Sequence, residues 1–141
     1  MITTSSTPTH TTGTAQKGDR TAQRNLAERT SKFAYNVRTF VRRTPKTLAS
    51  MGDCRRLARS SGEIGSSYLQ ADIAPSREAF LFHITDCCRE ARQTGHWLHL
   101  LSGDLDEKGE QMHAKLVQEA GELEKIFGAI LYKVRSKKKE D

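Results

Sequence analysis

Residues 80–101 have the sequence FLFHITDCCREARQTGHWLHLL and carry the clearest periodic pattern in the chain. Apolar or small residues recur there in alternating steps of four and three, the spacing of one buried face of a helix in a bundle. The positions on this face are Phe80, Ile84, Cys87, Ala91, Thr94, Leu98 and Leu101. Because so narrow a stripe must be buried against other helices, the segment predicts a long helix inside an all-α domain.

Three other segments repeat this spacing. Their stripe positions are Leu26, Thr30, Phe33, Val37 and Phe40; then Cys54, Leu57, Ser61, Ile64, Tyr68 and Ala71; then Leu116, Ala120, Leu123, Phe127, Ile130 and Val134. Strand-like alternation is nowhere sustained. Since the connections are short, neighbouring helices should run antiparallel, and the predicted fold is an all-α, antiparallel up-down four-helix bundle.

Residues with turn or capping preferences mark the ends of these helices. Pro45 ends the first helix, because the residue before a proline avoids the helical region. Ser76 suits the cap of the third helix, and Gly103 fits its end. Asp104 and Glu107 have the spacing of a capping pair, which predicts that the fourth helix opens directly after Asp104.

The chain of 141 residues has room for one such domain. We divide it into a Ser/Thr-rich tail over residues 1–24, a bundle over residues 25–135 and a basic tail over residues 136–141. Nine of the first 14 residues are Ser or Thr, and no apolar side chain follows Ile2 within them, so we predict a disordered N-terminal tail. An organelle transit peptide has a similar composition and is the alternative.

Composition excludes several classes of protein. Only 35% of the residues are hydrophobic, and no run of about 18 apolar residues exists to cross a membrane. The three cysteines cannot pair evenly, and Cys87 and Cys88 are adjacent, which argues against a secreted disulfide framework. These features predict a cytoplasmic protein.

Basic and acidic residues are segregated along the chain, whose net charge is +6. Residues 29–59 hold nine Lys and Arg against Asp53, whereas residues 104–124 hold seven Asp and Glu against two Lys. Helical spacing places several of the basic side chains on shared faces, where their phosphate contacts would add up. We predict nucleic-acid binding by Arg38, Arg42, Arg43, Arg55, Arg56 and Arg59.

The alternative is a solvated basic surface that the acidic segment of a neighbouring subunit partly neutralises. Charge alone does not decide between the two. Aromatic residues are scarce in the basic segment, which disfavours the stacking that single-strand binders use. Structured RNA or duplex DNA, held by its backbone, is therefore the predicted ligand.

Other candidate sites carry weaker signals. A di-iron bundle needs two Glu-x-x-His repeats, but Glu110 with His113 is the single copy, so we predict no metal, no cofactor and no enzymatic activity. Cys87 lies on the apolar stripe, where core filling is favoured over a redox role. Trp97 lies off the main stripe, where it either widens the core or contacts another subunit, and we assign it to an oligomer interface.

Residues 60–67, SSGEIGSS, place two glycines inside the second predicted helix. Each interior glycine costs a helix about 1 kcal/mol relative to alanine. Close packing of two helices over these small residues would offset that cost. Phosphate binding is the alternative, although neither a Gly-Lys-Ser/Thr sequence nor a preceding strand is present.

Five stretches resemble a known family. Residues 59–71, RSSGEIGSSYLQA, are similar to the signature RS-x-x-S-I-x-A-N-x-x-E-A of the bacterial four-helix bundle family that includes the proteins encoded in 23S rRNA intervening sequences. Residues 80–83, 88–94 and 97–101 resemble its third helix, and residues 116–123 resemble its fourth. Glu63 and Ser67 depart from the signature, which puts shared surface chemistry in doubt.

This resemblance implies a cytosolic, non-enzymatic bundle that assembles into a homopentamer. A related branch, the accessory variability determinant of diversity-generating retroelements, works with a reverse transcriptase and nucleic acid. The resemblance therefore implies a ribonucleoprotein or retroelement-accessory role, with a reverse transcriptase as a possible partner. The competing expectation is a protein-interaction scaffold whose charged faces serve only self-assembly.

Overall fold

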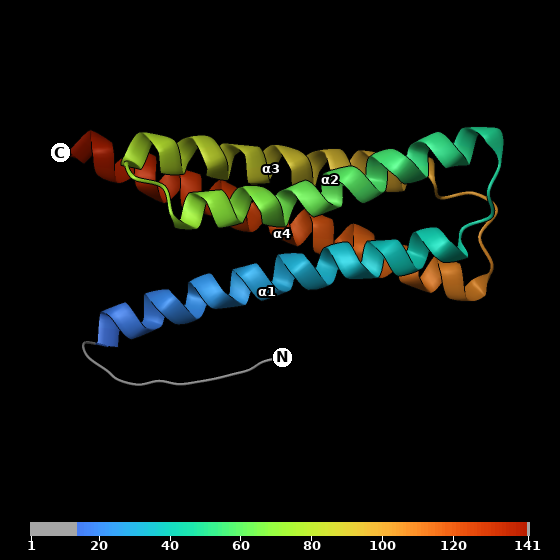
Figure 1. Cartoon of the computed structure of the whole chain (residues 1–141), viewed down its shortest axis with the longest axis horizontal. Helices are drawn as coiled ribbons and strands as arrows, with labels where there is room; N and C mark the ends of the chain where they lie inside the picture. Colours follow the sequence, from blue (N-terminus) through green and yellow to red (C-terminus); the bar gives the residue numbers. More distant parts are fainter. Residues whose placement is uncertain (1–13, 141) are drawn as a thin grey trace.

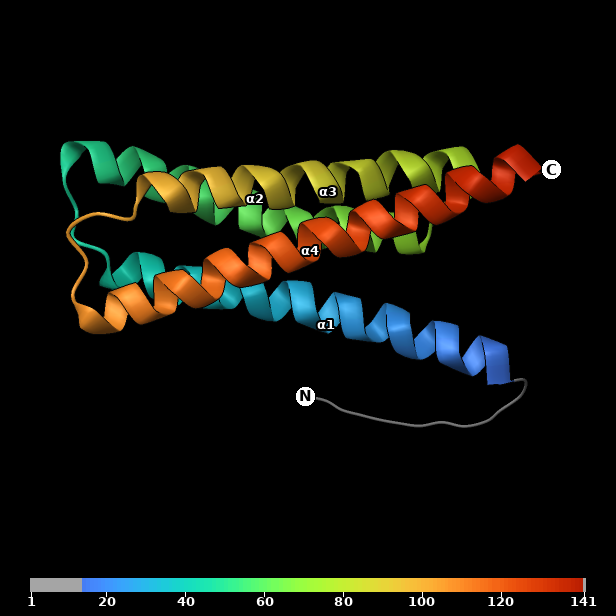
Figure 2. The ribbon, with the colours of Figure 1, turned by 180° about the vertical axis from the view of Figure 1, so that it is seen from behind.

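The computed structural model describes residues 14–140, and within them the chain forms four α-helices and no strand. The helices are α1 (Thr14–Arg43), α2 (Leu48–Asp72), α3 (Arg77–Leu100) and α4 (Glu107–Glu140). Successive helices run in opposite directions along one long axis (Figures 1 and 2). The predicted all-α, up-down four-helix bundle is confirmed.

Each helix packs against two neighbours, in the order α1, α2, α3, α4 and back to α1. Among the described residues, the backbones of diagonally opposite helices do not approach each other, although long side chains such as Tyr68 of α2 and Phe127 of α4 meet across the core. The predicted stripes form the core between them, because a residue every third or fourth position keeps to the same side of a helix. The largest fully buried side chains include Phe33, Phe40, Phe127, Leu57 and Ile64.

The bundle is looser at the end that holds the α2–α3 connection, which we call the open end. There the first turns of α1 diverge from the other three helices (Figures 1 and 2). Four predicted core positions near this end, Leu26, Phe80, Ile130 and Val134, are only partly buried. They are less buried because α1 and the other three helices diverge from each other at this end.

Two helix starts are capped by hydroxyl side chains. Thr47 Oγ1 accepts a hydrogen bond from Ser50 N at 3.1 Å, and Ser50 Oγ accepts one from Thr47 N at 2.8 Å, which completes a capping box for α2. Ser76 Oγ accepts from Ala79 N at the start of α3, as predicted.

The prediction that Asp104 caps the fourth helix is wrong. Asp104 has φ of 58°, a left-handed conformation that Asp tolerates better than most residues, and it turns the chain before α4 begins. Asp106 caps α4 instead, because its Oδ1 accepts from Gly109 N at 2.7 Å. That hydrogen bond and the nearby Arg43 lower the pKa of the Asp106 carboxyl.

The predicted boundaries at residues 25 and 135 fall inside helices. α1 begins at Thr14, so residues 14–24 are its first turns, and α4 continues to Glu140. Disorder was predicted for the whole of residues 1–24. Residues 14–24 are helical instead, and residues 1–13 lie outside the described part of the chain. Among residues 14–140, no helix combines the length and the apolar character needed to span a membrane.

The glycine-rich stretch of α2 is a site of close helix packing, which supports that interpretation over phosphate binding. A Cβ atom at Gly65 would lie 3.1 Å from Oγ1 of Thr30 on α1. Thr30 is 1% exposed, and its hydroxyl donates to the carbonyl oxygens of Leu26 and Ala27 at 2.8 and 3.1 Å. α1 and α2 approach this closely because position 65 carries no side chain.

Substituting two glycines should therefore have different effects. Gly121→Ala on α4 should raise the free energy of unfolding by about 0.5–1 kcal/mol, because alanine favours the helix and no atom lies within 4 Å of the added methyl group. Gly65→Ala should lose that gain, because its methyl group would press on a threonine held by two hydrogen bonds. Urea unfolding of both variants checks this, and an equal or larger gain at Gly65 would contradict the close approach.

Candidate nucleic-acid interface

The six predicted arginines all lie on the surface of the bundle, with exposed side chains. Arg38, Arg42 and Arg43 come from α1, while Arg55, Arg56 and Arg59 come from α2. They do not form one group, because α1 has α2 on one side and α4 on the other.

The α4 side of α1 pairs its arginines with acidic residues. Arg43 Nη2 lies 3.1 Å from Asp106 Oδ2. Arg29, one of the nine basic residues of the segment, forms a bidentate pair with Glu119, with Nε–Oε2 at 2.6 Å and Nη2–Oε1 at 2.8 Å. The hydrogen bonds to Glu119 raise the pKa of Arg29. The acidic segment thus neutralises basic residues of its own chain on this side.

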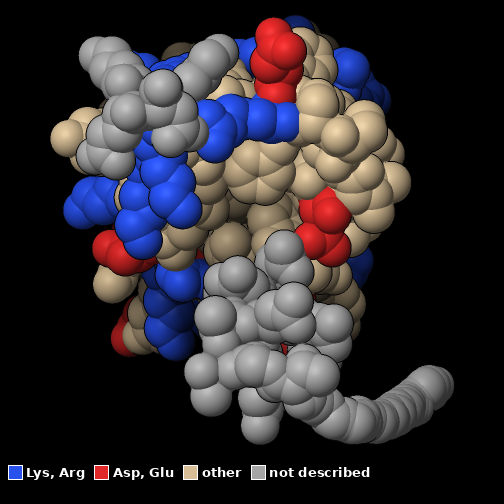
Figure 3. All heavy atoms as spheres, turned by 90° about the vertical axis from the view of Figure 1, so that its left-hand side faces the viewer, with Lys and Arg blue, Asp and Glu red and all other residues tan. Residues whose placement is uncertain are grey.

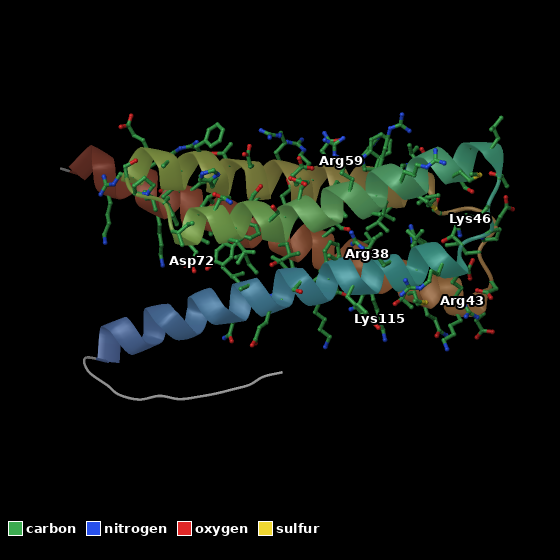
Figure 4. The ribbon with its side chains drawn as sticks, in the orientation of Figure 1. Arg38, Arg43, Lys46, Arg59, Asp72 and Lys115 are labelled. Atoms are coloured by element: carbon green, nitrogen blue, oxygen red, sulfur yellow. The ribbon has the colours of Figure 1, made fainter. Side chains whose placement is uncertain are left out.

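The α2 side of α1 is different, because Arg38 there lies against α2, one turn beyond Arg59, and not against the acidic segment. Arg38 Nη1 donates to the carbonyl oxygen of Ala34 at 3.1 Å. Its Nη2 reaches α2, where a Cβ atom at Gly62 would lie 3.4 Å away. Figure 4 shows Arg38 in the space between α1 and α2, with Arg43 at the far end of α1. Arg38 therefore joins the basic side chains of the two helices.

On α2, the arginines extend this surface toward α3. The guanidinium of Arg56 lies over the ring of Trp97 on α3, 5.3 Å from its centroid. Burial raises the pKa of Glu90 on α3, and positive charge from Arg89 and Arg59 opposes that rise. Arg59 nevertheless makes no ion pair with this carboxylate or with any other described residue.

We call the resulting surface the α1–α2 basic face. All five of its members are exposed, and none of them forms an ion pair with a residue whose side chain the structure describes, residues 25–137. They are Arg38, Arg42, Arg55, Arg56 and Arg59. Five cations that form no ion pair with a described carboxylate can bind several phosphates at once. Arg43, the sixth predicted residue, is separated from this face by its pairing with Asp106.

Tyr35 is an aromatic side chain near this face that was not predicted from the sequence, because aromatic residues are scarce in the basic segment. This side chain lies on α1 one turn before Arg38 and is 65% exposed. Its signal in the sequence is an aromatic residue off the apolar stripe, between Lys32 and Arg38. An aromatic ring is thus part of the surface around the α1–α2 basic face.

Trp97 has partners within its own chain. It packs against the hydrophobic core, lies under Arg56, and contacts the ring of His96 with centroids 4.7 Å apart. These contacts agree with the interpretation that Trp97 widens the core. Its assignment to an oligomer interface stays a prediction.

The cysteines fill the core. Cys87 is fully buried, its thiol donates to the carbonyl oxygen of Ile64 at 3.5 Å, and burial raises its pKa to about 12. Burial also raises the pKa of Cys54 and Cys88. A thiol that keeps its proton at neutral pH is a poor nucleophile and metal ligand. No three His, Cys, Asp or Glu side chains converge as in a metal site within the described range.

A second basic area lies at the open end. Lys133, Arg135 and Lys137 have exposed side chains on the last turns of α4. Seen from this end, the Lys and Arg side chains gather mainly along one side, and uncharged surface covers much of the rest (Figure 3). The predicted basic tail is thus presented on a helix up to the last residues that the structure describes.

Comparison with known proteins identifies a shared architecture. No family model and no curated protein matches the chain. Among solved structures, the chain is similar to a protein of unknown function from the S23 ribosomal protein family of Bacteroides thetaiotaomicron, with a TM-score of 0.65 and 19% sequence identity. The similarity covers 75% of this chain and 97% of that one. The two proteins share a fold.

Proposed function

We propose that this protein is a non-enzymatic nucleic-acid-binding protein that holds structured RNA or duplex DNA by its phosphates on the α1–α2 basic face. The observation that carries the proposal is that some arginines form ion pairs with carboxylates and others do not. Arg29 and Arg43 form ion pairs with Glu119 and Asp106, whereas the five arginines of the basic face form none with any described residue. Guanidinium groups suit this role because they remain charged at any physiological pH and because each one can donate two parallel hydrogen bonds to phosphate oxygens.

Two further points support a ribonucleoprotein setting. The structural neighbour carries a ribosomal family name, and residues 59–71 resemble a signature of the family that includes proteins encoded in rRNA intervening sequences. We extend the proposal to a homo-oligomer, a pentamer by the same resemblance, in which the basic face is repeated around a ring. A ribonucleoprotein or a reverse transcriptase is the partner we propose for this assembly.

One observation favours the alternative, a protein-interaction scaffold. Four large apolar side chains are exposed toward the open end, as expected of a surface that another subunit covers. They are Leu69, Ile73, Phe82 and Tyr132, with exposed fractions of 59, 76, 63 and 74%. In that case the charged faces serve only self-assembly.

A binding titration at several salt concentrations distinguishes the two functions. If all five arginines of the basic face contact phosphates of duplex DNA, log affinity should fall with log salt with a slope of about −4.5, at roughly 0.9 per contact. Sedimentation in the same buffers reports the oligomeric state. Absence of binding to both duplex DNA and a structured RNA at about 50 mM salt, with the oligomer intact, would reject nucleic-acid binding in favour of the scaffold.

A further inference from the structure

Tyr35 is a large aromatic side chain that the fold does not use. It is 65% exposed on α1, whereas Tyr68 of α2 is 4% exposed and packs against Phe127, with ring centroids 6.0 Å apart. No described residue makes a ring contact, a cation–π contact or a hydrogen bond with the Tyr35 side chain, and Thr39 Oγ1 donates only to the Tyr35 backbone carbonyl oxygen, at 3.4 Å. Trp97, by contrast, has Arg56 over its ring. Tyr35 therefore has a free aromatic face.

The neighbours of Tyr35 on the helix surface are polar or basic. Residues three and four positions away lie next to it on an α-helix, and these are Ser31, Lys32, Arg38 and Thr39. Arg38 donates to Ala34 and extends toward α2, so its guanidinium is held at the basic face. The free ring thus lies at the edge of a surface that carries unpaired positive charge.

The spacing along α1 fits a nucleic-acid strand that passes from the ring to the cations. Arg38 follows Tyr35 by three residues and Arg42 by seven, which corresponds to about 4.5 and 10.5 Å along the helix axis. A nucleotide whose base lies on Tyr35 can therefore place its own phosphate and the next phosphates beside these guanidinium groups.

Building on the proposed function, we infer that Tyr35 stacks on an unpaired nucleobase, so that the protein prefers RNA in which an unpaired nucleotide adjoins a paired stem. Bases within a duplex are already stacked on each other and are closed to a side chain, whereas bases in loops and bulges are open to it. A stacked base contributes roughly 5- to 150-fold in affinity. The arginines would hold the stem by its phosphates, and the ring would select the unpaired base.

The test compares two RNAs that carry equal numbers of phosphates, a hairpin with an unpaired loop and a fully paired duplex. Tyr35→Ala should weaken hairpin binding on the order of tenfold, leave duplex binding unchanged and keep the salt slope, because no cation is removed. Tyr35→Phe and Tyr35→Trp should retain the preference, because both keep an aromatic face. Tyr132→Ala, which removes a tyrosine that is 74% exposed on α4 at the open end, is the matched control, provided that sedimentation shows an unchanged oligomer.

Each outcome is informative. Equal losses for Tyr35→Ala on both RNAs, or a loss no larger than that of Tyr132→Ala, would overturn the stacking role and leave phosphate binding intact. If the unchanged protein binds neither RNA at low salt, the stacking role fails together with the proposed function. Thermal unfolding should be the same for all variants, because both tyrosines are exposed.

Discussion

Phe127→Ala is expected to lower the free energy of unfolding by about 3–5 kcal/mol. Phe127 is fully buried on α4, and its ring contacts Tyr68 of α2 across the core. Truncation removes apolar area from the core and leaves a cavity that rigid neighbouring helices fill only in part. Because a domain of this size has a total stability of about 5–15 kcal/mol, the variant should be close to unfolding at 37 °C.

Urea denaturation followed by circular dichroism measures this loss, and Phe82→Ala is the matched control. It makes the same chemical change at a side chain that is 63% exposed on α3, so it should alter the free energy of unfolding by no more than about 0.5 kcal/mol. Losses of similar size at the two positions would contradict the placement of the core.

Replacing Arg38, Arg42, Arg55 and Arg59 together by Gln should reduce the magnitude of the salt slope by about 3.6, at roughly 0.9 for each phosphate contact removed. Between about 50 and 200 mM salt, this difference corresponds to about a 100-fold change in relative affinity. The variant should fold normally, because all four side chains are exposed and form no ion pair among the described residues.

Two double variants separate position from net charge. Arg42→Gln with Arg55→Gln removes two charges from the basic face and should reduce the magnitude of the salt slope by about 1.8. Arg29→Gln with Arg43→Gln also removes two charges, but from side chains that Glu119 and Asp106 already neutralise, so the slope should hardly change. Equal effects of the two pairs would show that the protein binds through its overall charge and has no defined face. Dissociation of the oligomer by the four-arginine variant would favour the scaffold.

The arrangement of charge shows where prediction from the sequence was insufficient. The spacing of Arg38 and Arg42 correctly indicated a shared side of α1, because that relation depends on one helix alone. Whether Arg43 belongs with them depends on what lies beside α1, and α4 places Asp106 there. The alternative to nucleic-acid binding had the acidic segment neutralise the basic surface of a neighbouring subunit, yet two of its carboxylates pair within the chain.

The sequence by itself determined the helices and their buried faces. Apolar spacing, a proline such as Pro45 and a cap such as Ser76 each act on residues only a few positions away. A stretch such as residues 80–101 therefore specifies its own helix and its buried side without reference to the rest of the chain. Only the tertiary structure decided which helices lie on the two sides of each helix. That order depends on how four stripes pack together, and it separates Arg43 from Arg38, covers Trp97 with Arg56 and leaves Tyr35 uncovered.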